Sequence, residues 1–166
     1  LKQIYNAAVH GREIVHRLQD FSRSAWISEN NELININQII TEVVDLAKIR
    51  WTHHATEGTV SRIQVVYNLS EGAFTTGKKS EIHEILLNLV LNATDAMPEK
   101  GTLSLTTKID THLEIIIKDT GMGMTEDIVE KCTQPFFTTK GEKGTGMGLT
   151  MVQNIMKSLD GTMDIK

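Results

Sequence analysis

The chain has 166 residues, 40% of them hydrophobic, and a formal net charge of -4 at pH 7. A chain of this length is able to bury one good core with a small appended element, but not two large domains. Because charges of both signs are mixed along the chain, no polybasic face is predicted, and nucleic acid and anionic membrane surfaces are disfavoured as partners.

The search for membrane spans, targeting signals and cysteine pairs bears mainly on the cellular location of the protein. The longest apolar run, residues 85–91, contains Asn88 and is too short to span a bilayer. There is no signal peptide, and Leu1 indicates a fragment of a longer protein. The single cysteine, Cys132, excludes an internal disulfide and favours an idle thiol in a reducing compartment. We expect a cytoplasmic location, with a membrane anchor elsewhere in the full-length protein left open.

Residues 1–25 carry a heptad pattern that is typical of a helix with a partner helix. The repeating positions are Leu1, Ile4, Ala8, Gly11, Val15 and Leu18. Three heptads are short for a self-sufficient coiled coil. We therefore interpret residues 1–27 as the end of a helical bundle and residues 28–166 as a second domain.

A short strand is predicted next, at residues 32–36, followed by a helix with Asn37 as its N-cap. The predicted buried residues of this helix are Ile40, Val43, Leu46 and Ala47. Residues 53–61 are predicted to form a loop. The adjacent His53 and His54 lie in it, and we do not interpret them as metal ligands.

Alternating apolar residues predict half-buried strands at 63–69, 103–105 and 113–117. Helices are predicted at 80–97 and at 149–159, the second closed by Gly161. A hairpin across Asp110 and Thr111 would pair the last two strands. Mixed strands and helices of this kind predict an α/β (α+β) two-layer sandwich, with a mixed, mostly antiparallel sheet and helices on one face.

The helix at residues 80–97 has two contrasting faces. Its core stripe is Ile82, Ile85, Leu86, Leu89, Ala93 and Met97, and its polar face is Glu84, Asn88, Asn92 and Asp95. A solvated face is the commoner meaning of such a pattern. However, asparagine inside a helix costs roughly 0.5 kcal/mol relative to alanine, and here the cost is repeated. Amide and carboxylate oxygens on one face suit Mg²⁺, which shares its shell with phosphates.

Asp119 has the same parity as the buried positions of its strand, so its carboxylate is expected to point inward and to need donors. Two interpretations stay open. The residue opens an Asx-turn before a glycine turn, or it accepts a hydrogen bond from the exocyclic amine of a base. In the second case Gly121 and Gly123 would let a flat ring approach the backbone.

The stretch Gly144-Thr-Gly146-Met-Gly148 precedes the last predicted helix. It matches neither the GxGxxG dinucleotide fingerprint nor the GxxxxGK[ST] P-loop. The N–H groups at a helix start favour phosphate, although a flexible connection is the alternative. A cation face, a base-reading aspartate and a phosphate loop together predict a nucleotide site.

Four ordered motifs resemble the N, G1, F and G2 boxes of sensor histidine kinases, whose ATP-binding domain has a Bergerat-type fold. They are Glu84-xxx-Asn88-xxx-Asn92, Asp119-Thr-Gly121-Met-Gly123, Pro135-Phe-Phe137-Thr-Thr-Lys140 and Gly144-Thr-Gly146-Met-Gly148-Leu. The resemblance covers most of the chain. RLQDFSRS at residues 17–24 is similar to the end of a kinase dimerisation domain, and PFFTTK with its short lid resembles the nitrogen-regulation type.

The resemblance implies a role for each motif. Asn88 would be the Mg²⁺ ligand and Asn92 a contact to phosphate or to the outer shell of the ion. Asp119 would read adenine, and Glu84 would polarise the attacking histidine, while Lys140 in the lid would close over the γ-phosphate. The implied ATP-binding residues are Asn88, Asn92, Asp95, Asp119, Gly121, Gly123, Met124, Phe137, Thr138, Thr139, Lys140, Gly144, Thr145, Gly146, Met147, Gly148 and Leu149.

The implied activity is transfer of the γ-phosphate of ATP to a histidine on the dimerisation domain of a homodimer, and then to an aspartate on a response regulator. The family's acceptor motif, a histidine followed by an acidic residue and asparagine-proline, does not occur around His10 or His16. The sequence stops at Lys166, before the hairpin that usually completes the family's sheet. Two other classes stay open, a related ATPase that hydrolyses ATP and a non-catalytic nucleotide-binding module.

Overall fold

The computed structural model describes residues 31–53, 62–141 and 144–166. The predicted heptad helix and most of the loop predicted at residues 53–61 lie outside this part of the chain. The elements are β1 (Glu32–Asn35), α2 (Ile36–His53), β2 (Arg62–Leu69), β3 (Phe74–Gly77), α3 (Lys79–Asp95), β4 (Lys100–Ile109), β5 (Leu113–Asp119), α4 (Glu126–Lys131) and α5 (Gly148–Ser158).

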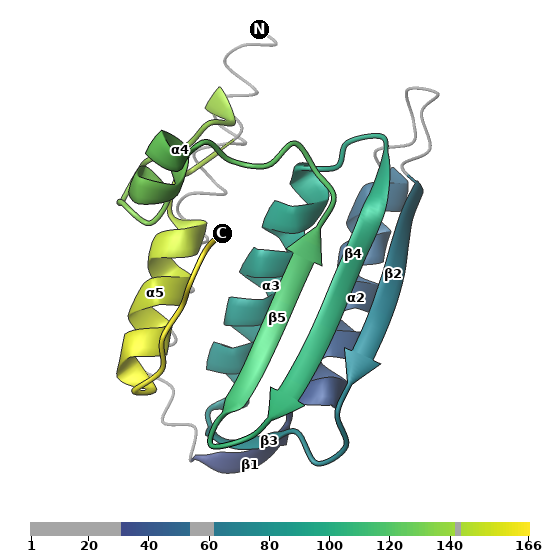
Figure 1. Ribbon diagram of the computed structural model, residues 1–166, viewed down its shortest axis with the longest axis vertical. Coiled ribbons are helices and arrows are strands. Elements are labelled where there is room, and N and C mark those ends of the chain that lie inside the picture. The colour runs from purple at the N-terminus through teal and green to yellow at the C-terminus, as the bar shows by residue number, and fades with distance from the viewer. Residues whose placement is uncertain (1–30, 54–61, 142–143) are drawn as a thin grey trace, which may run out of the picture.

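The main sheet has three strands in the order β2-β4-β5 (Figure 1). Strand β2 pairs with β4 in parallel, beginning with Arg62 opposite Lys100. Strands β4 and β5 form an antiparallel hairpin, whose turn is closed by the Asp110 N–H donating to the His112 carbonyl at 3.2 Å. The three strands and the hairpin predicted from alternation are confirmed.

A second sheet pairs β1 with β3 in antiparallel fashion, with Glu32 opposite Gly77 and Asn35 opposite Phe74. The short strand predicted at residues 32–36 is confirmed, and it ends at Asn35. Strand β3 is an addition to the prediction, because Phe-Thr-Thr-Gly has no apolar alternation that would indicate a strand.

Helices α2 and α3 cover one face of the main sheet, and α5 packs beside α3 (Figure 1). Leu103 and Leu105 of β4 are fully buried, because alternate residues of the strand face the helices. The two-layer sandwich with helices on one face is confirmed. Its core consists of Ile34, Ile36, Ile39, Ile40, Val43, Val44, Ala47, Ala73, Ile82, Leu86, Val90, Ala93, Met97, Leu103 and Leu105.

The start of α2 differs from the prediction. Asn35 takes the N-cap role assigned to Asn37, since its Oδ1 accepts from the N–H of Gln38 at 3.3 Å. The Asn37 side chain donates instead to the Ser70 carbonyl at 2.8 Å and accepts from Thr107 Oγ1 at 3.1 Å. Asn37 therefore ties α2 to the main sheet.

Three further details of the helices were predicted wrongly. Leu46 is 50% exposed, while Val44 lies in the core. On α3, Leu89 is only partly buried and Val90 is buried in its place. The two helices pack on each other, and both share the core with the main sheet, so their apolar faces are wider than one stripe. His53 is the last residue of α2 rather than a loop residue.

The end of α5 is closed by a Schellman motif. The N–H of Gly161 donates to the Met156 carbonyl at 2.8 Å, and the N–H of Asp160 donates to the Lys157 carbonyl at 3.3 Å. The predicted closure at Gly161 is confirmed, but Asp160 is the residue with the left-handed conformation, at φ 53.

Cys132 follows α4 as a free, buried thiol, and its Sγ donates to the Val129 carbonyl at 3.1 Å. Burial raises the pKa of this thiol, which fits the expected idle cysteine. None of the helices in the described ranges has the length and apolar character needed to cross a membrane.

Candidate functional site

The polar face of α3 is covered by the first turn of α5. A Cβ on Gly148, where α5 begins, would lie 3.0 Å from Asn88 Oδ1 and 3.8 Å from Asn92 Nδ2. The Asn88 Nδ2 donates to the Glu84 carbonyl at 2.9 Å, so its Oδ1 is left to face α5. Glycine at position 148 therefore brings the N–H groups of a helix start next to two amide side chains.

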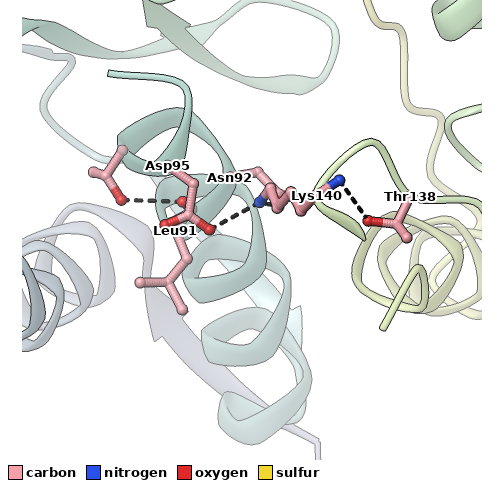
Figure 2. A network of polar contacts seen from close by, with 6 residues as sticks. Leu91, Asn92, Asp95, Thr138 and Lys140 are labelled. Atoms are coloured by element: carbon pink, nitrogen blue, oxygen red, sulfur yellow. Dashed lines mark hydrogen bonds and ion pairs between the residues drawn. The ribbon is translucent and has the colours of Figure 1, made fainter. Parts of the chain in front are cut away.

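Lys140 reaches from the loop after Phe137 to the last turns of α3 (Figure 2). Its Nζ donates to Asn92 Oδ1 at 3.0 Å and lies 2.8 Å from Asp95 Oδ2. The lysine and aspartate side chains are 38% and 36% exposed, so this is a surface ion pair. The amide oxygen of Asn92 thus already accepts from a cationic group.

The turn that carries Lys140 is held by its own residues. Thr138 Oγ1 accepts from the N–H of Lys140 at 3.1 Å, and the N–H of Gly144 donates to the Gly141 carbonyl at 3.2 Å. A Cβ on Gly144 would collide with Thr138 Oγ1. The described residues on either side of positions 142 and 143 therefore pack against each other.

Gly146 lies against the backbone of Phe136, where any Cβ would overlap the Phe136 carbonyl carbon. The N–H of Phe136 donates to the Gly146 carbonyl at 3.0 Å. Both residues are left-handed, at φ 65 for Gly146 and φ 66 for Phe136, and the Phe136 side chain is 74% exposed. The F box and the G2 box are thus in direct contact. The sequence pattern carries no signal for Phe136, since bulky residues rarely adopt this conformation.

Asp119 ends β5 and opens the other glycine loop. Its Oδ1 accepts from the N–H of Gly121 at 2.8 Å, which confirms the Asx-turn. The N–H of Met122 donates to the Ala96 carbonyl at 3.2 Å, and a Cβ on Gly121 would lie 2.6 Å from that oxygen. Gly121 therefore packs closely on the end of α3, whereas an added Cβ on Gly123, at φ 69, would have no atom within 4 Å.

The structure places the other residues predicted for the site at different degrees of burial. Glu84, Phe137, Thr145, Met147 and Leu149 are partly buried, and Met124 and Thr139 are exposed. Ala96 was missed, because its contribution is a backbone carbonyl that no side-chain pattern signals.

The oxygen ligands at this site suit a metal ion that is also bound to a polyphosphate better than a metal ion held by protein groups alone. Within the described ranges, no group of three or more His, Cys, Asp or Glu is placed to hold a metal ion. Mg²⁺ usually takes one or two protein oxygens and fills its shell with phosphates and water. The amide oxygen of Asn88, beside the start of α5, matches that requirement.

Comparison with known proteins gives a consistent family. Residues 77–166 match the family described as histidine kinase-, DNA gyrase B-, and HSP90-like ATPase. Sporulation kinase C of Bacillus subtilis is 31% identical over 134 residues, which cover 79% of this chain and 29% of that protein. Sensor histidine kinase ZraS of Salmonella typhimurium is 33% identical over 144 residues, covering 81% and 28%. The chain thus spans less than a third of the length of these relatives.

A solved structure agrees with the sequence relatives. The catalytic domain of histidine kinase ThkA, in a nucleotide-free form, matches with a TM-score of 0.66 and 27% identity, over 78% of this chain and 82% of that one. All four motifs lie within the matched family region. The chain therefore belongs to the histidine kinase-, DNA gyrase B- and HSP90-like ATPase family and carries the ATP-binding catalytic domain of a histidine kinase.

Proposed function

We propose that the full-length protein is a homodimeric sensor kinase that phosphorylates a histidine of its dimerisation domain and passes the phosphoryl group to an aspartate on a response regulator. Residues 1–27 would end the dimerisation domain, and residues 28–166 would form the catalytic domain. The observation that carries the proposal is the meeting of Asn88 and Asn92 with Gly148 at the start of α5. It brings amide groups suited to a Mg²⁺ shell next to a helix start suited to phosphate.

In this proposal ATP lies along α3. Asp119 accepts from the adenine amine, residues 144–149 surround the phosphates, and Lys140 reaches the γ-phosphate. Asn88 is the proposed Mg²⁺ ligand, and bound Mg²⁺ would neutralise charge on the phosphates. Asn92 ranks after Asn88 as a Mg²⁺ ligand, because its Oδ1 already accepts from the Lys140 ammonium.

Glu84 is the residue we assign to the acceptor histidine. It lies one turn before Asn88 on α3 and is partly buried. Its carboxylate would accept from one imidazole N–H, so that the other ring nitrogen stays unprotonated and attacks the γ-phosphorus. A nitrogen–phosphorus bond forms while the bond to the bridging oxygen breaks, and ADP leaves.

A labelling assay tests the proposed function. The domain is incubated with ATP labelled in the γ-phosphate and with a separately prepared dimerisation domain that carries an acceptor histidine. We expect label on that partner that is lost in acid and survives base, as a phosphoramidate on imidazole requires. Free phosphate without protein label would establish the ATPase alternative, and nucleotide binding without either product would establish the non-catalytic module.

A further inference from the structure

The contact between Lys140 and α3 joins the F-box loop, defined here as residues 135–141, to the helix that carries the asparagines (Figure 2). The Lys140 Nζ lies 2.8 Å from Asp95 Oδ2 and 3.0 Å from Asn92 Oδ1. The lysine backbone is fixed beside this contact, because its N–H donates to Thr138 Oγ1. The ammonium therefore lies on the amide oxygen of Asn92, one helical turn from Asn88, the proposed Mg²⁺ ligand.

We propose that this ion pair is a latch. In the nucleotide-free protein Lys140 holds the F-box loop on α3, and ATP binding moves the lysine from the Asp95 carboxylate to the γ-phosphate. The inference rests on the proposed function, because the γ-phosphate is the second anion that the lysine needs. ADP lacks this phosphate, so the latch stays closed when ADP is bound.

The exposure of the pair sets the strength of the latch. An ion pair exposed to this degree changes an equilibrium by at most about fivefold. A phosphate carries more charge than a carboxylate and offers three acceptor oxygens, so the lysine gains by the exchange. Salt screens such a surface contact, and the latch is therefore expected to loosen as ionic strength rises.

Opposite effects of the two partners distinguish a latch from a purely structural ion pair. Asp95→Asn frees the loop and the lysine, so amide hydrogen exchange in the F-box loop speeds up and ATP binds up to about fivefold tighter. Lys140→Gln also speeds up exchange, but it weakens ATP binding, because the γ-phosphate loses its contact. We expect ADP affinity to change less than ATP affinity in both variants, because ADP has no γ-phosphate for the lysine.

Asp45→Asn is the matched control. Asp45 forms a comparable exposed pair with Lys48 on α2, also at 2.8 Å, and its loss should leave exchange in the F-box loop and both affinities at native values. Exchange is measured without nucleotide by mass spectrometry, at low and high salt, and the affinities are measured by calorimetry.

Native exchange rates in both Asp95→Asn and Lys140→Gln would overturn the latch. Weaker ATP binding in both variants, or equal tightening for ATP and ADP in Asp95→Asn, would overturn the transfer of Lys140 to the γ-phosphate. If the native domain does not bind ATP at all, the proposed function fails in the calorimeter, while the exchange measurement still decides whether the pair holds the loop.

Discussion

The two glycine loops of the site are anchored to different parts of the molecule. The loop at residues 119–123 is fixed to the core, with Asp119 ending a strand and Met122 hydrogen-bonded to the last carbonyl of the α3 region, that of Ala96. The loop at residues 144–148 packs on another loop, through the contact of Gly146 with Phe136, and on α3 through Gly148. The proposed base end of the site is therefore anchored on core elements, whereas the proposed phosphate end is anchored partly on another loop.

This division suits the ligand that we propose. Adenine keeps its shape through a phosphoryl transfer, and a fixed loop is enough to recognise it. The phosphates change in number and charge when ATP becomes ADP, so the groups around them must rearrange between two states. A loop that rests partly on the F-box loop, whose Lys140–Asp95 pair is a weak surface contact, would allow this at little cost in stability.

The largest effect is expected on the rate of phosphoryl transfer, from a substitution of Glu84. Glu84→Gln should slow phosphorylation of a dimerisation domain by about 10²- to 10⁴-fold, because it removes the carboxylate that orients the imidazole. ATP affinity should be nearly unchanged, since the proposed binding mode assigns Glu84 no contact with the adenine or the phosphates. Rate and affinity are measured on the same preparation by labelling and calorimetry. A parallel loss of ATP affinity would place Glu84 in the binding site instead.

The next largest effect is expected for Asn88→Ala, on the Mg²⁺ dependence of ATP binding. Asn88→Ala should remove at least about 10-fold of the gain in ATP affinity that Mg²⁺ produces. The helix itself should be slightly favoured by the better propensity of alanine. Asn92→Ala is the comparison variant. ATP affinity is measured by calorimetry with and without Mg²⁺. The residue whose substitution removes the Mg²⁺ effect is the metal ligand. An intact effect in both variants would show that this face of α3 is only a solvated face.

At the base end, Asp119→Asn should weaken ATP binding by about 10-fold or more, because a hydrogen bond to a charged acceptor is lost. Asparagine also forms Asx-turns, so the hydrogen bond to the Gly121 N–H is retained and the loop keeps its shape. Discrimination between ATP and GTP should fall as well. Equal ATP and GTP titrations of the native domain would contradict the assignment of Asp119 to adenine.

The smallest effect concerns the stability of the fixed loop. Gly121→Ala forces a Cβ against Ala96 and should cost about 1–3 kcal/mol of unfolding free energy. Gly123→Ala meets no neighbouring atom, and only its positive φ opposes the substitution, at a cost of about 1–2 kcal/mol. Urea denaturation compares the two. A larger loss for Gly123→Ala would show that the loop is not packed on α3.

The parts of the fold that could be predicted from the sequence are those with a regular hydrophobic period. The alternation in β2, β4 and β5 and the two faces of α3 led to the correct layers, because each pattern reports burial on one side of a single element. The four motifs led to the family for a different reason, since their order along the chain is itself specific. Strand β3 escaped because its four residues have no alternating pattern.

Contacts between distant segments explain what was not predictable. Lys140 was expected to close over a phosphate, but nothing local to it indicates a partner at Asp95, which lies on a different element. The close packing of Gly121 on Ala96 is another contact between segments distant in the sequence that no local pattern indicates. The left-handed Phe136 likewise packs on Gly146, to whose carbonyl its N–H donates.

The parallel pairing of β2 with β4 has a consequence for the order of folding. The β4–β5 hairpin closes across the turn at Asp110, so its contacts are local. Pairing Arg62 with Lys100 instead encloses β3 and all of α3 between the two strands. Closing so long a segment costs chain entropy before any strand contact forms, and contacts of high sequence separation slow folding. We therefore expect β2 to join the sheet last, after α3 has packed on the hairpin.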